Sequence, residues 1–187
     1  QVFEAYDERE ESEFVVGEVQ KLVADPPPSS LAADVESIAP RRFDASLDLV
    51  RSQIRAYARL YERTRQRMRY SNERTIRMTQ IFEKMRSLAT ASYPLLDELV
   101  ESPSPGERLA AVAILEVFAA ERYLPFLSNM VIKEKPFVGY YGARALHFAV
   151  GALDPLVHPV LLDEIQKAQT ALEQPGVIDP TDRLSEL

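Results

Sequence analysis

An uninterrupted helical pattern in the first half of the chain sets the strongest limit on its fold. From Asp44 to Met68 there is no proline or glycine, and apolar residues recur at intervals of three and four. At 100° per residue, this spacing places one set of side chains on one side of an α-helix: Leu47, Val50, Ile54, Tyr57 and Tyr61. Asp44 is a residue type that caps helix N-termini. We therefore predict a helix that begins at Asp44 and buries this side.

A second stripe of the same kind follows after a short polar break. Its apolar members again share one side of a helix: Met78, Ile81, Phe82, Met85 and Leu88. Ser71 or Asn72 can cap the N-terminus of this helix. The two stripes predict a long antiparallel helical hairpin over residues 44–92, joined near residues 70–72.

From residue 93 onward, the pattern changes to shorter helices that begin near prolines. The segment Ser104-Pro105-Gly106-Glu107 has the form of a capping box with proline at the first helical position. The helix it starts, over residues 109–120, carries only one charge, so it must be covered on several sides. Further helices are expected over residues 123–131, 136–150 and 159–172. No segment alternates in the manner of a strand, so the predicted fold class is all-α.

An internal repeat organises these shorter helices. Pro105 and Pro136 are 31 residues apart, as are Leu115 and Leu146, and each pair marks a short helix followed by a longer, alanine-rich one. A unit of this size cannot bury its apolar face alone, and stacking against its neighbours solves that problem. We therefore expect two to three stacked helix pairs, a short α-solenoid.

The residues SPGERLAAV (104–112) and VGYYGARAL (138–146) resemble HEAT-type helical repeats, in the short form of bacterial proteins. The segments YERTR (61–65) and NERTIRM (72–78) are similar to leader segments of helical modules in bacterial multidomain signalling and defence proteins. The resemblance implies a non-catalytic, regulatory module that serves an effector elsewhere. Because the chain starts at Gln1 rather than Met, we expect a processed chain or a piece of a longer one.

Four parts of the chain are expected. Residues 1–43 form an acidic, proline-containing N-terminal arm, and residues 44–92 form the arginine-rich hairpin. Residues 93–173 contain the HEAT-like repeats, which pack with the hairpin as one domain. Residues 174–187 are an acidic tail.

Charge is distributed very unevenly. The chain has a net charge of −7, but residues 51–86 contain 11 basic and 3 acidic residues. Within this segment, arginines recur every four residues and drift around the helix from the flank of the apolar stripe to the opposite face: Arg51, Arg55, Arg59, Arg63 and Arg67. Neighbouring like charges repel, so something should neutralise this face.

Three kinds of neutralising partner are open for this arginine row. Solvent and counterions are the simplest, with the arginine stems covering apolar surface. An acidic peptide is the second, either the chain's own residues 4–13 or a partner with an acidic surface. Nucleic acid is the third, although a pI near 5.0 counts against it. We take binding of an acidic partner by this face as the first functional hypothesis, with nucleic-acid binding as its alternative.

An aromatic cluster of Phe137, Tyr140 and Tyr141 is the second candidate contact surface, because tyrosine is favoured at interface centres. Core packing explains the same cluster, and its glycines would then allow close helix packing. His147 lies in an apolar helical segment and is expected to be a hydrogen-bonded packing residue. His158, before Pro159, is expected at the start of a helix.

The sequence contains none of the motifs that mark common catalytic sites. It has no cysteine, no Gly-rich phosphate loop, no GxSxG and no HExxH pattern, so we expect no catalytic, cofactor-binding or metal-binding residues. An enzyme would need a site without recognisable spacing, which remains a minor alternative. No apolar run reaches the length of a membrane span. The expected product is a cytoplasmic protein–protein interaction or regulatory module of a larger bacterial assembly.

Overall fold

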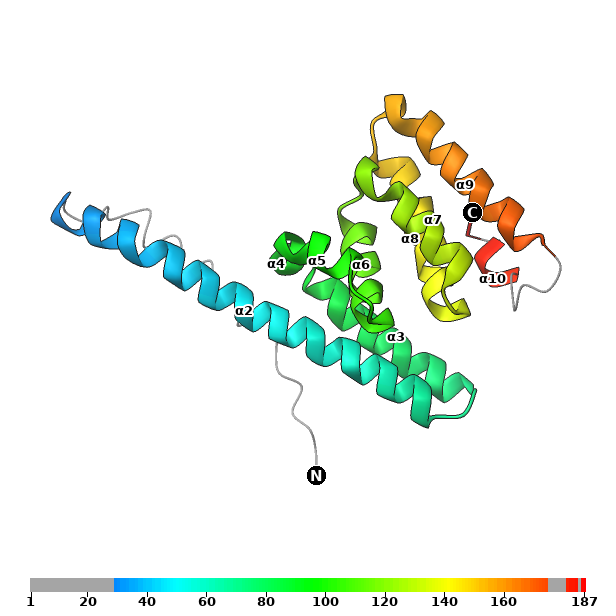
Figure 1. Cartoon of the computed structure of the whole chain (residues 1–187), viewed down its shortest axis with the longest axis horizontal. Helices are drawn as coiled ribbons and strands as arrows, with labels where there is room; N and C mark the ends of the chain where they lie inside the picture. The colour runs from blue at the N-terminus through cyan, green and yellow to red at the C-terminus, as the bar shows by residue number, and fades with distance from the viewer. Residues whose placement is uncertain (1–28, 175–180, 185) are drawn as a thin grey trace. The chain divides into compact units, whose positions relative to one another are not determined.

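The computed structural model describes residues 29–174, 181–184 and 186–187, with side chains described from residue 46 onward except at residues 181 and 182. Every regular element in these ranges is a helix, which confirms the all-α prediction for the described residues (Figure 1). The chain divides into two compact units, residues 1–45 and 46–187. The acidic segment 4–13 and half of the predicted tail, residues 175–180 and 185, lie outside the described residues.

Helix α2 (Ser29–Arg67) begins earlier than the sequence predicts. Its backbone is helical through Pro40, so Asp44 lies inside the helix and is not its N-cap. A proline in a helix interior removes one backbone hydrogen bond and usually ends or kinks a helix, which is why the sequence favours a later start. The apolar stripe is nevertheless where the spacing places it, with Ile54 and Tyr61 fully buried.

Helix α3 (Asn72–Ser87) starts as predicted. The Ser71 side chain is its N-cap and accepts a hydrogen bond from the Arg74 backbone N–H at 3.2 Å. The predicted stripe is buried over most of its length, with Leu88 half-buried at the end: Met78, Ile81, Phe82 and Met85.

The second half of the chain alternates short and long helices. Proline occupies the first helical position of both α6 and α8, as predicted. The short helices are α4 (Ala89–Ser92), η1 (Tyr93–Leu95), α5 (Leu96–Val100), η2 (Glu121–Tyr123) and η3 (Pro155–Val157). The longer helices are α6 (Pro105–Val117), α7 (Leu124–Lys133), α8 (Pro136–Ala152) and α9 (His158–Leu172), and a further short helix is α10 (Thr181–Leu184).

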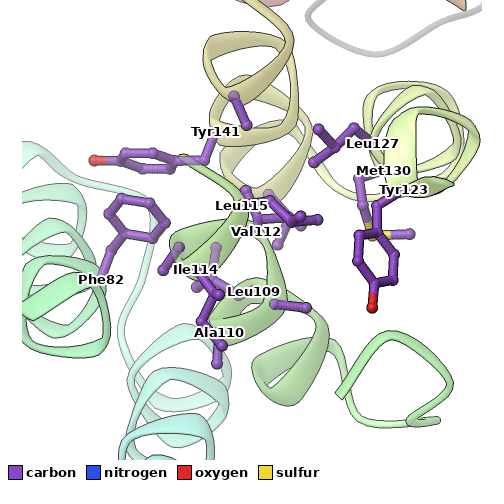
Figure 2. Close-up of a cluster of buried hydrophobic side chains, with 14 of the residues drawn as sticks. Phe82, Leu109, Ala110, Val112, Ile114, Leu115, Tyr123, Leu127, Met130 and Tyr141 are labelled. Carbon is purple, nitrogen blue, oxygen red and sulfur yellow. The ribbon is translucent and has the colours of Figure 1, made fainter. Parts of the chain in front are cut away.

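Helix α6 is the centre of the core of residues 46–187. Seven consecutive residues from Leu109 to Leu115 are completely buried, as expected because residues 109–120 carry only one charge. Helix α3 packs on one side of α6 and α8 on another, while α7 packs against both α8 and α9. Figure 2 shows the Phe82 and Tyr141 rings facing each other beside α6, with ring centroids 3.7 Å apart.

A close contact joins α2 to the start of α6. A Cβ atom on Gly106 would lie 2.5 Å from the Ala58 carbonyl oxygen, so only glycine fits there. One turn further along α2, the Glu62 carboxylate accepts hydrogen bonds from the Ser104 hydroxyl at 2.6 Å and from the Gly106 N–H at 3.1 Å. Glu62, the one acid within the arginine row, therefore caps α6 from outside the helix.

The end of the chain docks on α8 through α10. Arg183 is buried and donates a hydrogen bond to the Val131 carbonyl oxygen at 2.9 Å. Its aliphatic stem lies against Gly139, where a Cβ atom would be 2.6 Å away. Gly142 faces Met130 and Leu127 of α7, so both glycines allow close packing, as the sequence suggests. Of the helices in the described ranges, none has both the length and the apolar character of a membrane span.

Candidate functional site

The first two arginines of the row are engaged within residues 46–187. Arg51 pairs with Asp48 and, through Nε, with the Glu98 carboxylate at 3.1 Å. Arg55 Nη2 lies 2.7 Å from the other Glu98 oxygen, and its Nε lies 3.6 Å from Glu107. These pairs tie α2 to α5 and α6. Arg51 and Arg55 therefore already have carboxylate partners in the folded chain.

The other three arginines of the row, Arg59, Arg63 and Arg67, are exposed and form no ion pair with any described residue. Two of them line a shallow groove of about 260 Å³, which we call the arginine groove. Its lining comes from α2, α3 and the residue after α2: Leu60, Arg63, Thr64, Arg67, Met68 and Arg77.

The chemistry of the arginine groove is simple. Three guanidinium groups line the groove together with apolar surface from Leu60 and Met68, and no carboxylate in the described part of the chain is among the lining residues. Guanidinium forks match carboxylate and phosphate oxygens in a bidentate geometry. The groove can therefore receive a group that carries negative charge beside an apolar portion.

The aromatic cluster divides between the core and the surface. Tyr141 is buried, stacked on Phe82 and covered by the Arg144 guanidinium 4.5 Å from its ring centroid. Phe137 and Tyr140 are only half-buried. The Tyr140 pKa is raised by burial and by the nearby Glu186 carboxylate, which accepts a hydrogen bond from its hydroxyl.

Phe137, Tyr140 and Tyr141 line a second cavity of about 520 Å³, which we call the aromatic–basic cavity. Its other lining residues come mainly from the end of α2 and the start of α3: Arg65, Tyr70, Arg74, Thr75, Met78, Thr79, Lys135 and Pro136. The structure thus brings the predicted aromatic cluster together with basic residues that sequence reasoning did not assign to it. One feature of the sequence could have indicated this cavity: basic and aromatic side chains stand at two helix starts, near residues 72 and 136.

The two histidines take no part in either site. His147 is exposed, so the expectation of a packing residue is wrong, because α8 turns that position away from α6 and α7. His158 is the first residue of α9, as expected. In the described ranges, no three histidine, aspartate or glutamate side chains lie close enough together to hold a metal ion.

Tyr61 provides a test of the packing between α2 and α8. Its ring is fully buried 5.7 Å from that of Phe137, and burial raises the pKa of its hydroxyl from 10.0 to about 12. The protonated form is therefore favoured in the folded state. The part of the folding stability that depends on the protonated Tyr61 hydroxyl is fully present below pH 10. As the pH rises from 10 to 12, the free energy of unfolding falls by about 1.4 kcal/mol per pH unit.

We predict that Tyr61→Phe loses less stability than the wild type does when the pH rises above 10. Its hydroxyl makes no hydrogen bond with described residues, so the variant should match or exceed the wild-type stability at pH 8. Urea unfolding at pH 8 and pH 11 measures both effects. Other tyrosines titrate in both proteins, so the difference between the two proteins isolates Tyr61. An identical pH dependence would contradict the assignment.

Comparison of the chain with protein-family models, with curated proteins and with solved structures finds no match. The residues of the arginine groove and the aromatic–basic cavity are therefore the basis for assigning a function.

Proposed function

We propose that the chain is a non-catalytic protein–protein interaction or regulatory module whose arginine groove binds an acidic segment of a partner protein. The scaffold would be a helical hairpin followed by HEAT-like helix pairs, within a larger bacterial signalling or defence assembly. The observation that carries this proposal is the contrast within one arginine row. Arg51 and Arg55 are neutralised by Glu98 and Glu107, whereas Arg63 and Arg67 have no carboxylate partner among the described residues.

The groove defines the chemistry of that partner. Arg63, Arg67 and Arg77 would each bind a carboxylate, while Leu60 and Met68 would contact an apolar side chain between the acidic residues. The matching sequence is a short acidic segment with an apolar residue near its centre. Arg59, one turn before Arg63 on α2, would contact the same segment beyond the groove.

The same surface fits nucleic acid less well. The phosphate backbone needs a track of basic residues that follows it over several nucleotides. Here the first two arginines of the row are already paired, and only two of the other three, Arg63 and Arg67, line the groove of about 260 Å³. The net charge of −7 would also repel a polyanion from the rest of the molecule.

Double charge reversal tests the proposal. The probe is a fluorescent peptide of sequence Glu-Glu-Leu-Glu-Glu, and binding is measured by anisotropy at low and moderate salt. We expect Arg63→Glu with Arg67→Glu to weaken binding by at least about tenfold, because two charge-assisted contacts become repulsive. The matched control is Lys84→Glu with Lys133→Glu, which makes the same change in net charge at exposed positions outside the groove.

Three results would contradict the proposal. One is equal loss of binding in the control pair, which would indicate a general effect of charge. Another is equal binding of a Gln-Gln-Leu-Gln-Gln peptide, which would show that the carboxylates do not matter. The last is binding of a DNA duplex, more tightly than the acidic peptide and with loss in the Arg63/Arg67 variant, which would favour the nucleic-acid alternative.

A further inference from the structure

The aromatic–basic cavity differs from the arginine groove in its residues and in its chemistry. Three cationic side chains line it, Arg65, Arg74 and Lys135, and no carboxylate of the described residues does. None of the three forms an ion pair with a described residue. Glu134, next to Lys135 in the chain, pairs with Arg108 instead. The cavity therefore has a positive charge that the described part of the chain does not neutralise.

Two helix N-termini add to this positive charge. Arg74 and Thr75 lie in the first turn of α3, and Pro136 and Phe137 lie in the first turn of α8. Both helices are long, with 16 and 17 residues, so each presents the positive end of a full helix dipole. Oxygen anions bind at helix N-termini for this reason.

An unpaired donor lies among the residues that line the cavity. Arg74 Nε is buried and donates to no acceptor among the described residues. Its Nη1 donates to the Met68 carbonyl oxygen at a long distance of 3.4 Å. A buried N–H without an acceptor is costly, so an anionic oxygen beside Arg74 would be bound favourably.

The remaining surface of the cavity suits a flat ring. Tyr70 is 81% exposed, and its ring lies 5.1 Å below the Arg74 guanidinium. Phe137 and Tyr140 supply aromatic surface from α8, and the hydroxyls of Thr75 and Thr79 lie among the lining residues. A volume of about 520 Å³ is within the range of small-molecule sites.

The geometry points to a binding site for a small organic phosphate with a planar ring, the chemistry of a nucleoside monophosphate. Arg74, Arg65 and Lys135 bind the phosphate at the two helix starts, and Tyr70 and Phe137 contact the ring. A carboxylate would satisfy the charge, but a phosphate offers more acceptor oxygens to three cations and two helix ends. This site is independent of the proposed contact at the arginine groove, because the two sites share no lining residue.

Calorimetric titration of the full chain tests the site. The ligands are the four common nucleoside monophosphates, the matching nucleosides, inorganic phosphate and phenyl phosphate. We expect at least one monophosphate to bind with a Kd below about 1 mM. We also expect its nucleoside and inorganic phosphate to bind at least about tenfold more weakly, because each lacks one half of the recognised chemistry. Phenyl phosphate separates two sources of this chemistry: weaker binding than the nucleotide supports a nucleotide ligand, and equal binding supports aryl phosphates in general.

Two variants locate the binding. Arg74→Gln should weaken nucleotide binding at least about tenfold, whereas Arg77→Gln, one turn along α3 and outside the cavity, should leave it unchanged. Tyr70→Ala should also weaken it about tenfold or more. Because Tyr70 is so exposed, this second variant should fold normally, and its thermal unfolding checks that it does.

Three outcomes would overturn the inference: no monophosphate or phenyl phosphate binding, inorganic phosphate binding as tight as the nucleotide, or unchanged affinity in both Arg74→Gln and Tyr70→Ala. The Arg63→Glu/Arg67→Glu protein should retain nucleotide binding, so failure at the groove and failure at the cavity can be distinguished.

Discussion

Glu116→Gln should destabilise the fold by about 2–3 kcal/mol. Its carboxylate is 2% exposed and binds Arg144 through both oxygens, at 2.6 and 3.1 Å, with Arg86 at 3.7 Å. Removing the charge leaves the Arg144 guanidinium without its main partner, beside the stacked Phe82 and Tyr141 rings. Arg144 is about one-fifth exposed, so water compensates for part of the loss. Urea unfolding monitored by helicity measures the change.

The control for this prediction is Glu101→Gln, at an exposed glutamate after α5, which should change stability by less than about 0.5 kcal/mol. A double-mutant cycle sharpens the test. Because Arg144→Met removes the unpaired charge, the Glu116→Gln/Arg144→Met protein should lose clearly less stability than the sum of the two single variants. Additive losses would show that the pair is not the source of the effect.

Gly106→Ala should lower the free energy of unfolding by about 2–3 kcal/mol, against the usual benefit of alanine in a helix. The added Cβ would lie 2.5 to 2.8 Å from three main-chain atoms of Ala58. Backbone atoms cannot rotate away, so α2 must shift from α6 and weaken the hydrogen bonds from Ser104 and Gly106 to Glu62. Thermal and urea unfolding both report this loss.

The matched control is Gly151→Ala, at an exposed glycine near the end of α8. Nothing lies within 4 Å of its added Cβ, so stability should stay the same or rise by up to about 1 kcal/mol. If Gly106→Ala behaved like Gly151→Ala, the close approach of α2 and α6 described above would be wrong.

Local patterns in the sequence predict most of the helices. Spacings of three and four identify the buried sides of α2 and α3. Proline identifies the starts of α6 and α8, with a capping serine before it at α6 only. These features depend on residues within one or two helical turns. The exception is the start of α2, where a helix continues through Pro40 and overrides the local signal.

The candidate sites depend on contacts between distant residues, so the sequence predicts them only in part. The row of arginines can be seen in the sequence, but which of them are paired with carboxylates cannot. Glu98, the partner of Arg51 and Arg55, lies more than 40 residues from both in the chain. In the same way, the cavity forms where Arg74 meets Phe137, more than 60 residues further along the chain. No periodicity relates such residues before the helices pack.

The central claim is that the unpaired arginines of the groove bind acidic groups of a partner, and NMR of the arginine Nε–H signals tests it directly. On addition of the Glu-Glu-Leu-Glu-Glu peptide, we expect the Arg63, Arg67 and Arg77 signals to shift, since their guanidinium groups line the groove. The signals of Arg51, Arg55 and Arg144 should remain in place, because carboxylates of the chain already occupy them. Shifts confined to the paired arginines, or no shift at saturating peptide, would contradict the account.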